Sequence, residues 1–216
     1  MITITGKTII DSLTFVGKRL TVRPAGPVSL YTFNDLNDDY GVMNISAGAV
    51  LGTYPVSPYG ACFNGSNDNP QTFTIPYTPL HSFVGAQPFS ISMDYYSETF
   101  DGDRVIYKQN QYTMSFDGNT NIHTFTLYDS ANGGSISVNA QGVNWWFISQ
   151  NLKYTYDGSG VASGLKVYVN NALITNVSYS TVGTFVSMVD DVKPLIVGTP
   201  TPFRDCYIDN FAINTL

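Results

Sequence analysis

Charged residues are scarce in this chain of 216 residues: Asp, Glu, Lys and Arg make up 12% of it, and glutamate occurs once, at Glu98. Cysteine and histidine occur twice each with no Cys-x-x-Cys pair, which excludes a zinc site of the usual ligand spacing. No apolar run approaches the roughly 18 residues of a membrane span, and no segment has a helical period. We therefore expect a protein built from strands, with no membrane partner.

The charge that is present is unevenly distributed. The net charge of −6 disfavours a nucleic-acid partner. Residues 1–27 hold four basic residues and one acidic residue, a balance of +3, whereas residues 28–216 hold six and fifteen, a balance of −9. This asymmetry suggests that residues 1–27 face something different from the rest. Alternation of apolar and polar residues, up to the Pro-Ala-Gly-Pro breaker at 24–27, predicts that they form a short β arm before the main domain, 28–216. The arm is either an edge hairpin of the same sandwich or a device for attachment or oligomerisation.

Alternation of apolar and polar residues predicts about a dozen or more strands. In residues 89–96, Phe89, Ile91 and Met93 alternate with polar side chains, which indicates a half-buried strand. Residues 152–177 read as a meander whose turns lie at Asp157-Gly158 and Asn170-Asn171. So many strands suit two large sheets packed face to face. Further strands are predicted at 72–75, 104–108, 112–116, 122–128, 135–138, 147–156, 181–189, 195–198 and 206–213.

Five segments of the chain, in order, carry a resemblance to a known family. They read LYTFND at 30–35, ACFNGSND at 61–68, FSISM at 89–93, YTYDG with GLKVYVNNAL at 154–173, and PLIVG with YIDNFAI at 194–213. Together they resemble the laminin-G-like domains of the concanavalin A-like lectin/glucanase superfamily. The resemblance covers roughly residues 28–216 and implies an all-β jelly-roll sandwich of two antiparallel sheets.

The resemblance also implies a calcium site. In the family, an early acidic or amide residue and an Asp of the last strand often meet at a cation. The matching residues are Asn34 or Asp35 and Asp209, and Ca²⁺ prefers such oxygen ligands. The alternative is that Asp209 hydrogen-bonds a turn.

Sugar binding would require aromatic platforms together with amide or acidic side chains. Trp145, Trp146 and Tyr96 are the candidates, and the alternative for the two Trp residues is support of the core or of an interface. Cys62 and Cys206 are expected to be buried thiols, or a disulfide if their Cα atoms lie within about 7 Å.

Glycoside hydrolysis is not expected, because it requires two carboxyl groups that flank the scissile bond. The hydrolases of the superfamily carry Glu-x-Asp-x-x-Glu on one strand, and this motif is absent. Asp94 and Glu98 would lie about 13 Å apart along an extended strand. His123 has the parity of Phe125 and Leu127, which favours a structural histidine over a general base.

The features together favour a non-enzymatic virion surface protein of a bacteriophage: a capsid decoration, head fibre or tail adhesin with a lectin-like domain. The residues after Met1 do not read as a signal peptide, and particles released by lysis need none. The expected partners are other virion proteins, reached through the arm, host-surface glycans and further copies of the chain. The alternative is a free bacterial carbohydrate-binding or adhesion module at the cell surface or outside the cell, and a glycosidase ranks below both.

Overall fold

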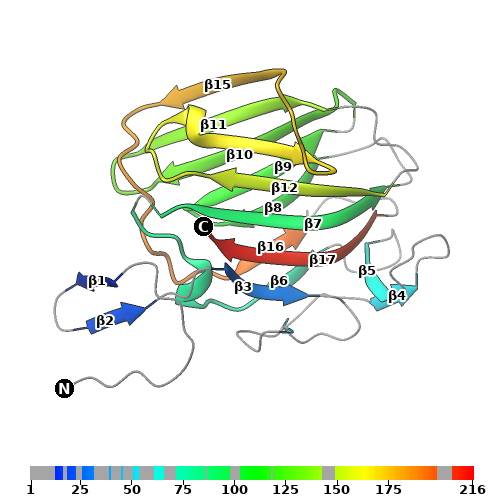
Figure 1. Cartoon of the computed structure of the whole chain (residues 1–216), viewed down its shortest axis with the longest axis horizontal. Helices are drawn as coiled ribbons and strands as arrows, with labels where there is room; N and C mark the ends of the chain where they lie inside the picture. The colour runs from blue at the N-terminus through cyan, green and yellow to red at the C-terminus, as the bar shows by residue number, and fades with distance from the viewer. Residues whose placement is uncertain are drawn as a thin grey trace.

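The computed structural model describes residues 13–16, 19–22, 26–31, 39, 45, 51–53, 61–65, 72–85, 87–97, 103–117, 119–142, 149–198 and 206–216. These residues form a sandwich of two antiparallel sheets, which confirms the predicted fold class (Figure 1). In the described part of the chain, no helix is long and apolar enough to cross a membrane.

One sheet has seven strands and the other has eight. The seven-stranded sheet runs in the order β15 (Val177–Val182), β11 (Gly134–Gln141), β10 (Ile122–Asp129), β9 (Tyr112–Asp117), β8 (Asp103–Lys108), β16 (Leu195–Gly198) and β6 (Thr72–Ile75). The eight-stranded sheet runs β14 (Ala172–Leu173), β13 (Leu165–Val169), β12 (Gln150–Tyr156), β7 (Phe89–Ser97), β17 (Cys206–Thr215), β5 (Ala61–Gly65) and β4 (Leu51–Thr53), and β3 (Gly26–Tyr31) also pairs with β17.

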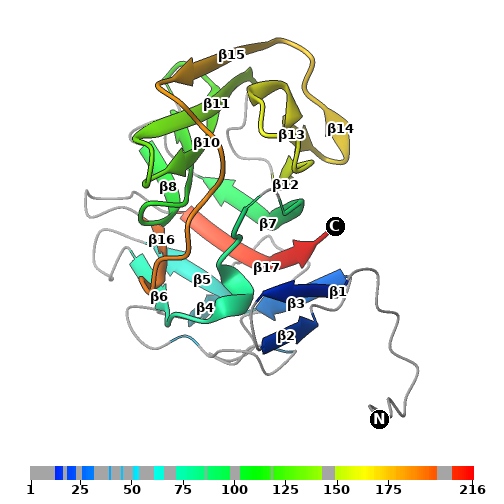
Figure 2. The same ribbon diagram turned by 90° about the vertical axis from the view of Figure 1, so that its left-hand side faces the viewer.

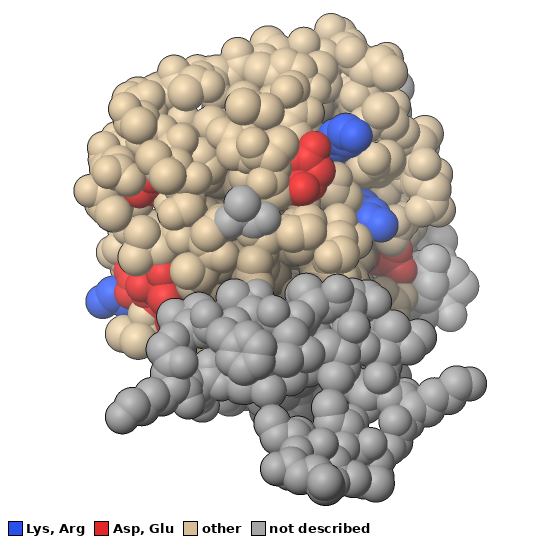
Figure 3. All heavy atoms as spheres, turned by 60° about the vertical axis from the view of Figure 1, so that its left-hand side comes forward, with Lys and Arg blue, Asp and Glu red and all other residues tan. Residues whose placement is uncertain are grey.

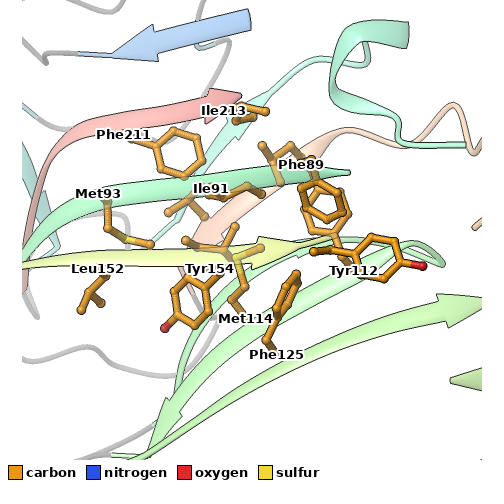
Figure 4. Close-up of a cluster of buried hydrophobic side chains, with 14 of the residues drawn as sticks. Phe89, Ile91, Met93, Tyr112, Met114, Phe125, Leu152, Tyr154, Phe211 and Ile213 are labelled. Carbon is orange, nitrogen blue, oxygen red and sulfur yellow. The ribbon is translucent and has the colours of Figure 1, made fainter. Parts of the chain in front are cut away.

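The core lies between the sheets and is built from the apolar positions of the alternating strands. β10 and β12 alternate strictly between buried and half-buried residues. Phe89 is at the centre: its ring stacks on Phe83 at 3.9 Å and contacts Tyr112, Phe125 and Tyr156 at 5.6–6.1 Å between centroids (Figure 4). Burying one such aromatic ring contributes about 1.5–3 kcal/mol, so the aromatic cluster stabilises the sandwich substantially.

The Asn170-Asn171 turn has the geometry that the sequence predicts. Both residues have positive φ, 50° and 64°, which Asn tolerates better than most residues. The side-chain oxygen of Asn170 also accepts the backbone N–H of Asn151 at 2.9 Å, so the turn is fastened to the neighbouring strand. Gly158, at φ 82°, makes the other predicted turn.

Two strand predictions were wrong in extent, and a third is described only in part. Of the strand expected at 147–156, β12 covers Gln150–Tyr156, and residues 143–148 lie outside the described residues. The strand expected at 172–177 is limited to Ala172–Leu173, because the chain then leaves the eight-stranded sheet for the seven-stranded one. The strand expected at 181–189 ends at Val182, where Gly183 turns with φ 60°.

Residues 183–194, here called the strap, replace the rest of that strand and connect β15 to β16. The backbone N–H groups of Val186 and Ser187 donate to the Asp129 carboxylate at 2.8 and 3.2 Å, so they need no strand partner. The side chain of Asn132 donates to the same carboxylate at 2.8 Å. These hydrogen bonds, led by that of Asn132, hold the pKa of Asp129 well below its ordinary value.

Lys108 anchors the other end of the strap. Its buried ammonium donates to the backbone carbonyls of Asp191 at 2.9 Å and Lys193 at 2.6 Å. It also lies 4.9 Å from the centroid of the Tyr77 ring, a cation–π distance. Burial lowers the pKa of Lys108, and Asp190 and Asp191 oppose that shift.

The N-terminal arm is described only in part. β1 (Leu13–Val16) and β2 (Arg19–Val22) pair with each other in a two-stranded sheet of their own (Figure 2). β3 begins at Gly26, near the predicted boundary, and pairs with β17. The division at residue 27 and the role of the arm stay predictions.

The backbone register separates the two cysteines. Cys206 is paired with Gly65, three residues from Cys62 on β5. Three residues of extended strand span about 10 Å, which exceeds the roughly 7 Å that a disulfide allows. The register therefore places the two Cα atoms farther apart than a disulfide allows.

Candidate functional site

Asp209, the predicted metal ligand, lies beside a second carboxylate. β17 pairs Asp209 with Asp94 of β7, and the register then shifts at a bulge that holds Asn210 at φ 49°. The side chain of Asn210 donates to Asp94 Oδ2 at 2.8 Å, and that of Asn151 donates to Asp94 Oδ1 at 2.9 Å. Asp94 of β7 is therefore hydrogen-bonded to both neighbouring strands, to β17 through Asn210 and to β12 through Asn151.

Within the pair, the environment of Asp209 disfavours its ionised form. Asp209 is 6% exposed, and burial raises its pKa to about 6. The backbone N–H of Asn210 opposes this shift, and the charge of Asp94 adds to it. Either a proton or a bound cation would relieve the repulsion between the two carboxylates.

The described residues supply only part of a calcium site. Ca²⁺ takes six to eight oxygen ligands, and no group of three or more His, Cys, Asp and Glu side chains suited to a metal occurs in the described part of the chain. Asn34 and Asp35, the other predicted ligands, lie outside the described residues. The sequence alone does not reveal Asp94 as the neighbour of Asp209, because 115 residues separate them.

The same carboxylate pair does not resemble a glycosidase centre. Asp94 and Asp209 are neighbours on adjacent strands of one sheet and do not face each other across a cleft. Both oxygens of Asp94 accept amide hydrogen bonds. Glu98, the single glutamate, lies outside the described residues.

A groove of about 490 Å³ lies on the outer face of the seven-stranded sheet, and we call it the tyrosine groove. Outward-facing residues of four adjacent strands line its floor: Tyr107 of β8, Thr113 of β9, Tyr128 of β10 and Ser135 of β11. The floor is preorganised, since the hydroxyls of Thr113 and Tyr128 hydrogen-bond at 3.3 Å. The hairpin turns that hold Gln109, Asn110, Ser130 and Gly133 form its rim.

The tyrosine groove offers polar groups but little net charge. Asp129, its one carboxylate, is occupied by Asn132 and by the amides of the strap. Asn110 is held at φ 64°, and its amide donates to Asp191 at 2.6 Å. Two tyrosine rings surrounded by amide and hydroxyl groups form a surface that suits a neutral sugar. The apolar CH face of a sugar ring can pack on a tyrosine ring, and the sugar hydroxyls can hydrogen-bond to the amides.

A second hollow of about 400 Å³, here called the lysine groove, lies on the eight-stranded sheet. The register places Lys153 opposite Tyr168 and Lys166 opposite Thr155, so all four side chains share the outer face of β12 and β13. Charged side chains are otherwise sparse over the described surface, as Figure 3 shows for one side of the molecule.

Of the three predicted sugar-binding residues, the structure describes only Tyr96. Tyr96 is half-buried on β7, opposite Tyr207, and lines neither groove. Trp145 and Trp146 lie outside the described residues. Tyr107 and Tyr128 were missed, although their parity with buried neighbours marks them as outward-facing aromatic residues; what the sequence does not show is that the sheet register aligns them.

Comparison with known proteins identifies structural neighbours only. No family model and no curated protein matches the chain. The chain is similar to the binding domain of Paraclostridial Mosquitocidal Protein 1, with TM-score 0.66 and 11% identity over 88% of this chain and 49% of that one. It is similar to the botulinum neurotoxin serotype G binding domain, with TM-score 0.64 and 13% identity over 88% and 48%.

A third neighbour is the binding domain of botulinum neurotoxin DC in complex with SialylT, with TM-score 0.59 and 17% identity over 88% and 48%. The chain thus spans about half the length of each of these domains. At such low identity the likeness shows the fold, an all-β sandwich of the kind found in toxin binding domains. The narrower resemblance to laminin-G-like domains stays a prediction.

Proposed function

We propose that the chain is a non-catalytic binding domain that attaches to glycans through the tyrosine groove. The observation that carries the proposal is the row formed by Tyr107, Thr113, Tyr128 and Ser135 across four strands, with amide side chains at its rim. The neighbours support it: all three are binding domains, and one is described in complex with SialylT.

Glycan arrays followed by isothermal titration with the best glycan test the site. Tyr107→Ala and Tyr128→Ala should each weaken binding at least tenfold, because each removes one stacking face. Tyr168→Ala is the matched control, since it removes an aromatic ring from the lysine groove on the other sheet, and it should leave affinity unchanged. If Tyr168→Ala abolishes binding and the other two variants do not, the tyrosine groove is the wrong site. If no glycan binds to the wild-type chain, the function is wrong.

Catalysis is tested on the same glycans. Prolonged incubation with the bound oligosaccharides should release no shorter product, as measured by mass spectrometry. Product that disappears in Glu98→Gln or Asp94→Asn would show a glycosidase and contradict the proposal.

We further propose that this domain belongs to a bacteriophage particle, as a laminin-G-like capsid decoration, head-fibre or tail-adhesin subunit that docks through residues 1–27. This proposal is based on the charge asymmetry between the basic arm and the acidic domain. Co-sedimentation with phage particles that is lost on deletion of residues 1–27 would support it. A chain that co-sediments with no particle but binds glycans would instead be a free adhesion module.

A further inference from the structure

β15 leaves one side of the seven-stranded sheet open. It pairs with β11 through six residues without a bulge, and nothing in the described part of the chain pairs with its other edge. All of its residues after Val177 are exposed. Figures 1 and 2 both place β15 at the rim of the sandwich. Two other edge strands have described side chains: β14 has only two residues, and β6, at the far edge of the same sheet, has four residues of which two are buried.

The usual protection of an edge strand is missing here. Monomeric proteins protect such edges with lysine, proline, bulges or very short strands. No charged residue occurs between Lys166 and Asp190, and no proline precedes Pro194 in that part of the chain. A long uncharged edge of this kind is a template for a further strand.

Exposed apolar side chains lie on and beside this edge strand. Tyr179 is opposite the buried Val138, so its ring points to the inner side of the sheet, yet 46% of it is exposed. η2 (Ala162–Gly164) lies against β15, and Val161, which precedes η2, is 51% exposed. Val182 is 62% exposed. A strand added to β15 would cover part of this surface.

The hydrogen-bond pattern defines which backbone groups of β15 are available. Gln141 N–H donates to the Asn176 carbonyl at 2.9 Å, and this pair continues the register of β11 with β15. Bonding alternates along an antiparallel ladder, so Ser178 and Ser180 bond to β11. Val177, Tyr179 and Thr181 therefore turn their N–H and C=O groups outward.

We propose that a second copy of this chain pairs antiparallel with β15 about a two-fold axis at Tyr179, joining two seven-stranded sheets into one. With three outward-bonding residues centred on Tyr179, the strand is complementary to itself: Val177 meets Thr181 of the second copy, and Tyr179 meets its own equivalent. An uncharged strand meets its copy without repulsion, and two tyrosine rings form a cross-strand pair. The pairing does not depend on glycan binding.

The mass of the full chain in solution, measured by sedimentation velocity over a range of concentrations, tests the proposal. We expect a dimer. Tyr179→Lys, which places two ammonium groups at the axis, should weaken dimerisation at least a hundredfold. Thr181→Pro should do the same, because it removes an outward N–H and leaves the bonds to β11 intact. Val192→Lys is the matched control: it adds the same charge at a side chain that is 72% exposed on the strap, and it should leave the dimer unchanged.

Hydrogen exchange then tests the register. The amides of Val177, Tyr179 and Thr181 should be protected in the wild-type dimer and exchange rapidly in Tyr179→Lys, while those of Ser178 and Ser180 stay protected in both. A wild-type monomer at all concentrations, a dimer that both β15 variants preserve, open-ended assembly, or a different protein paired with β15 would each overturn the proposal.

Discussion

The imidazole of His123 and the hydroxyl of Tyr154 form a hydrogen bond across the core, with 2.8 Å between Nδ1 and Oη. His123 belongs to β10 of one sheet and Tyr154 to β12 of the other, so the bond joins the two layers. The ring of His123 also stacks on Phe116 at 4.7 Å between centroids. Burial lowers the pKa of His123 to about 3, which keeps the imidazole neutral and agrees with the structural role predicted from the sequence.

This histidine should make stability depend on pH. In the unfolded chain the pKa of His123 is about 6.5. As the pH falls from about 6.5 toward 3, the unfolded state therefore binds a proton at this residue that the folded state does not bind. The stabilisation is complete above pH 6.5 and is lost as the solution is acidified. At pH 5 the free energy of unfolding should have fallen by about 2 kcal/mol from this cause.

The double variant His123→Phe/Tyr154→Phe removes both polar partners and provides the comparison. Urea unfolding measures the free energy of unfolding at pH 7 and at pH 5. The decrease in this free energy between the two pH values should be smaller in the double variant than in the wild type by about 2 kcal/mol. Equal losses in the two proteins would mean that His123 is not buried in its neutral form.

Lys108→Met should destabilise the protein by about 2–4 kcal/mol. Methionine keeps the apolar stem but removes the donor to two strap carbonyls and the cation above Tyr77. Lys193→Met is the control, because its side chain is exposed and only its backbone carbonyl accepts from Lys108; the change should stay within about 0.5 kcal/mol. Chemical denaturation measures the free energy of unfolding of both variants. A similar decrease in the two variants would refute the anchoring role of Lys108.

Gly134→Ala should also loosen the strap. A Cβ on Gly134 would overlap the backbone carbonyl of Thr184, so either β11 or the strap has to shift, at about 1–3 kcal/mol. Gly133→Ala is the matched control. The space beside Gly133 is open, so a Cβ would be strained only by the backbone φ of 68°, which should destabilise the protein by about 1 kcal/mol. Faster hydrogen exchange of Val186 and Ser187 in Gly134→Ala alone would locate the effect, and unchanged exchange would contradict it.

Calcium binding is proposed at Asp209, with Asn34 or Asp35 and with Asp94, the neighbour that the structure adds. Chelator-treated protein should release or absorb heat on titration with Ca²⁺ and unfold at a higher temperature in its presence. Asp209→Asn should abolish both effects, because it removes a charged ligand and the repulsion that a cation relieves. Absence of both the heat and the thermal shift in the wild type would refute the site.

Much of the sandwich could be predicted, because alternation along one strand is a local property of the sequence. Phe89, Ile91 and Met93 are buried as their spacing requires, and the Asn170-Asn171 turn has the positive φ that asparagine favours. The strap could not be predicted in this way. Its apolar residues Phe185 and Met188 read as a strand, but side chains from distant strands hold it instead.

The grooves and the carboxylate pair depend on register between strands that are far apart in the sequence. Asp94 meets Asp209 only because β17 lies beside β7, and the bulge at Asn210 decides which side chains lie opposite. Tyr107 and Tyr128 line one groove only because β8, β9 and β10 form consecutive hairpins of suitable length. No pattern within a single strand specifies such alignments.

β17 lies in the middle of the eight-stranded sheet, between β7 and β5, although residues 206–215 form its last strand in sequence. When β7 has been synthesised, its neighbour on one side, β17, is still more than a hundred residues away along the chain. Until residue 215 leaves the exit tunnel, the free side of β7 is available to other nascent chains. Folding of this layer must wait for the end of synthesis of the domain, and the interval before it is the period in which a chaperone would have most to protect.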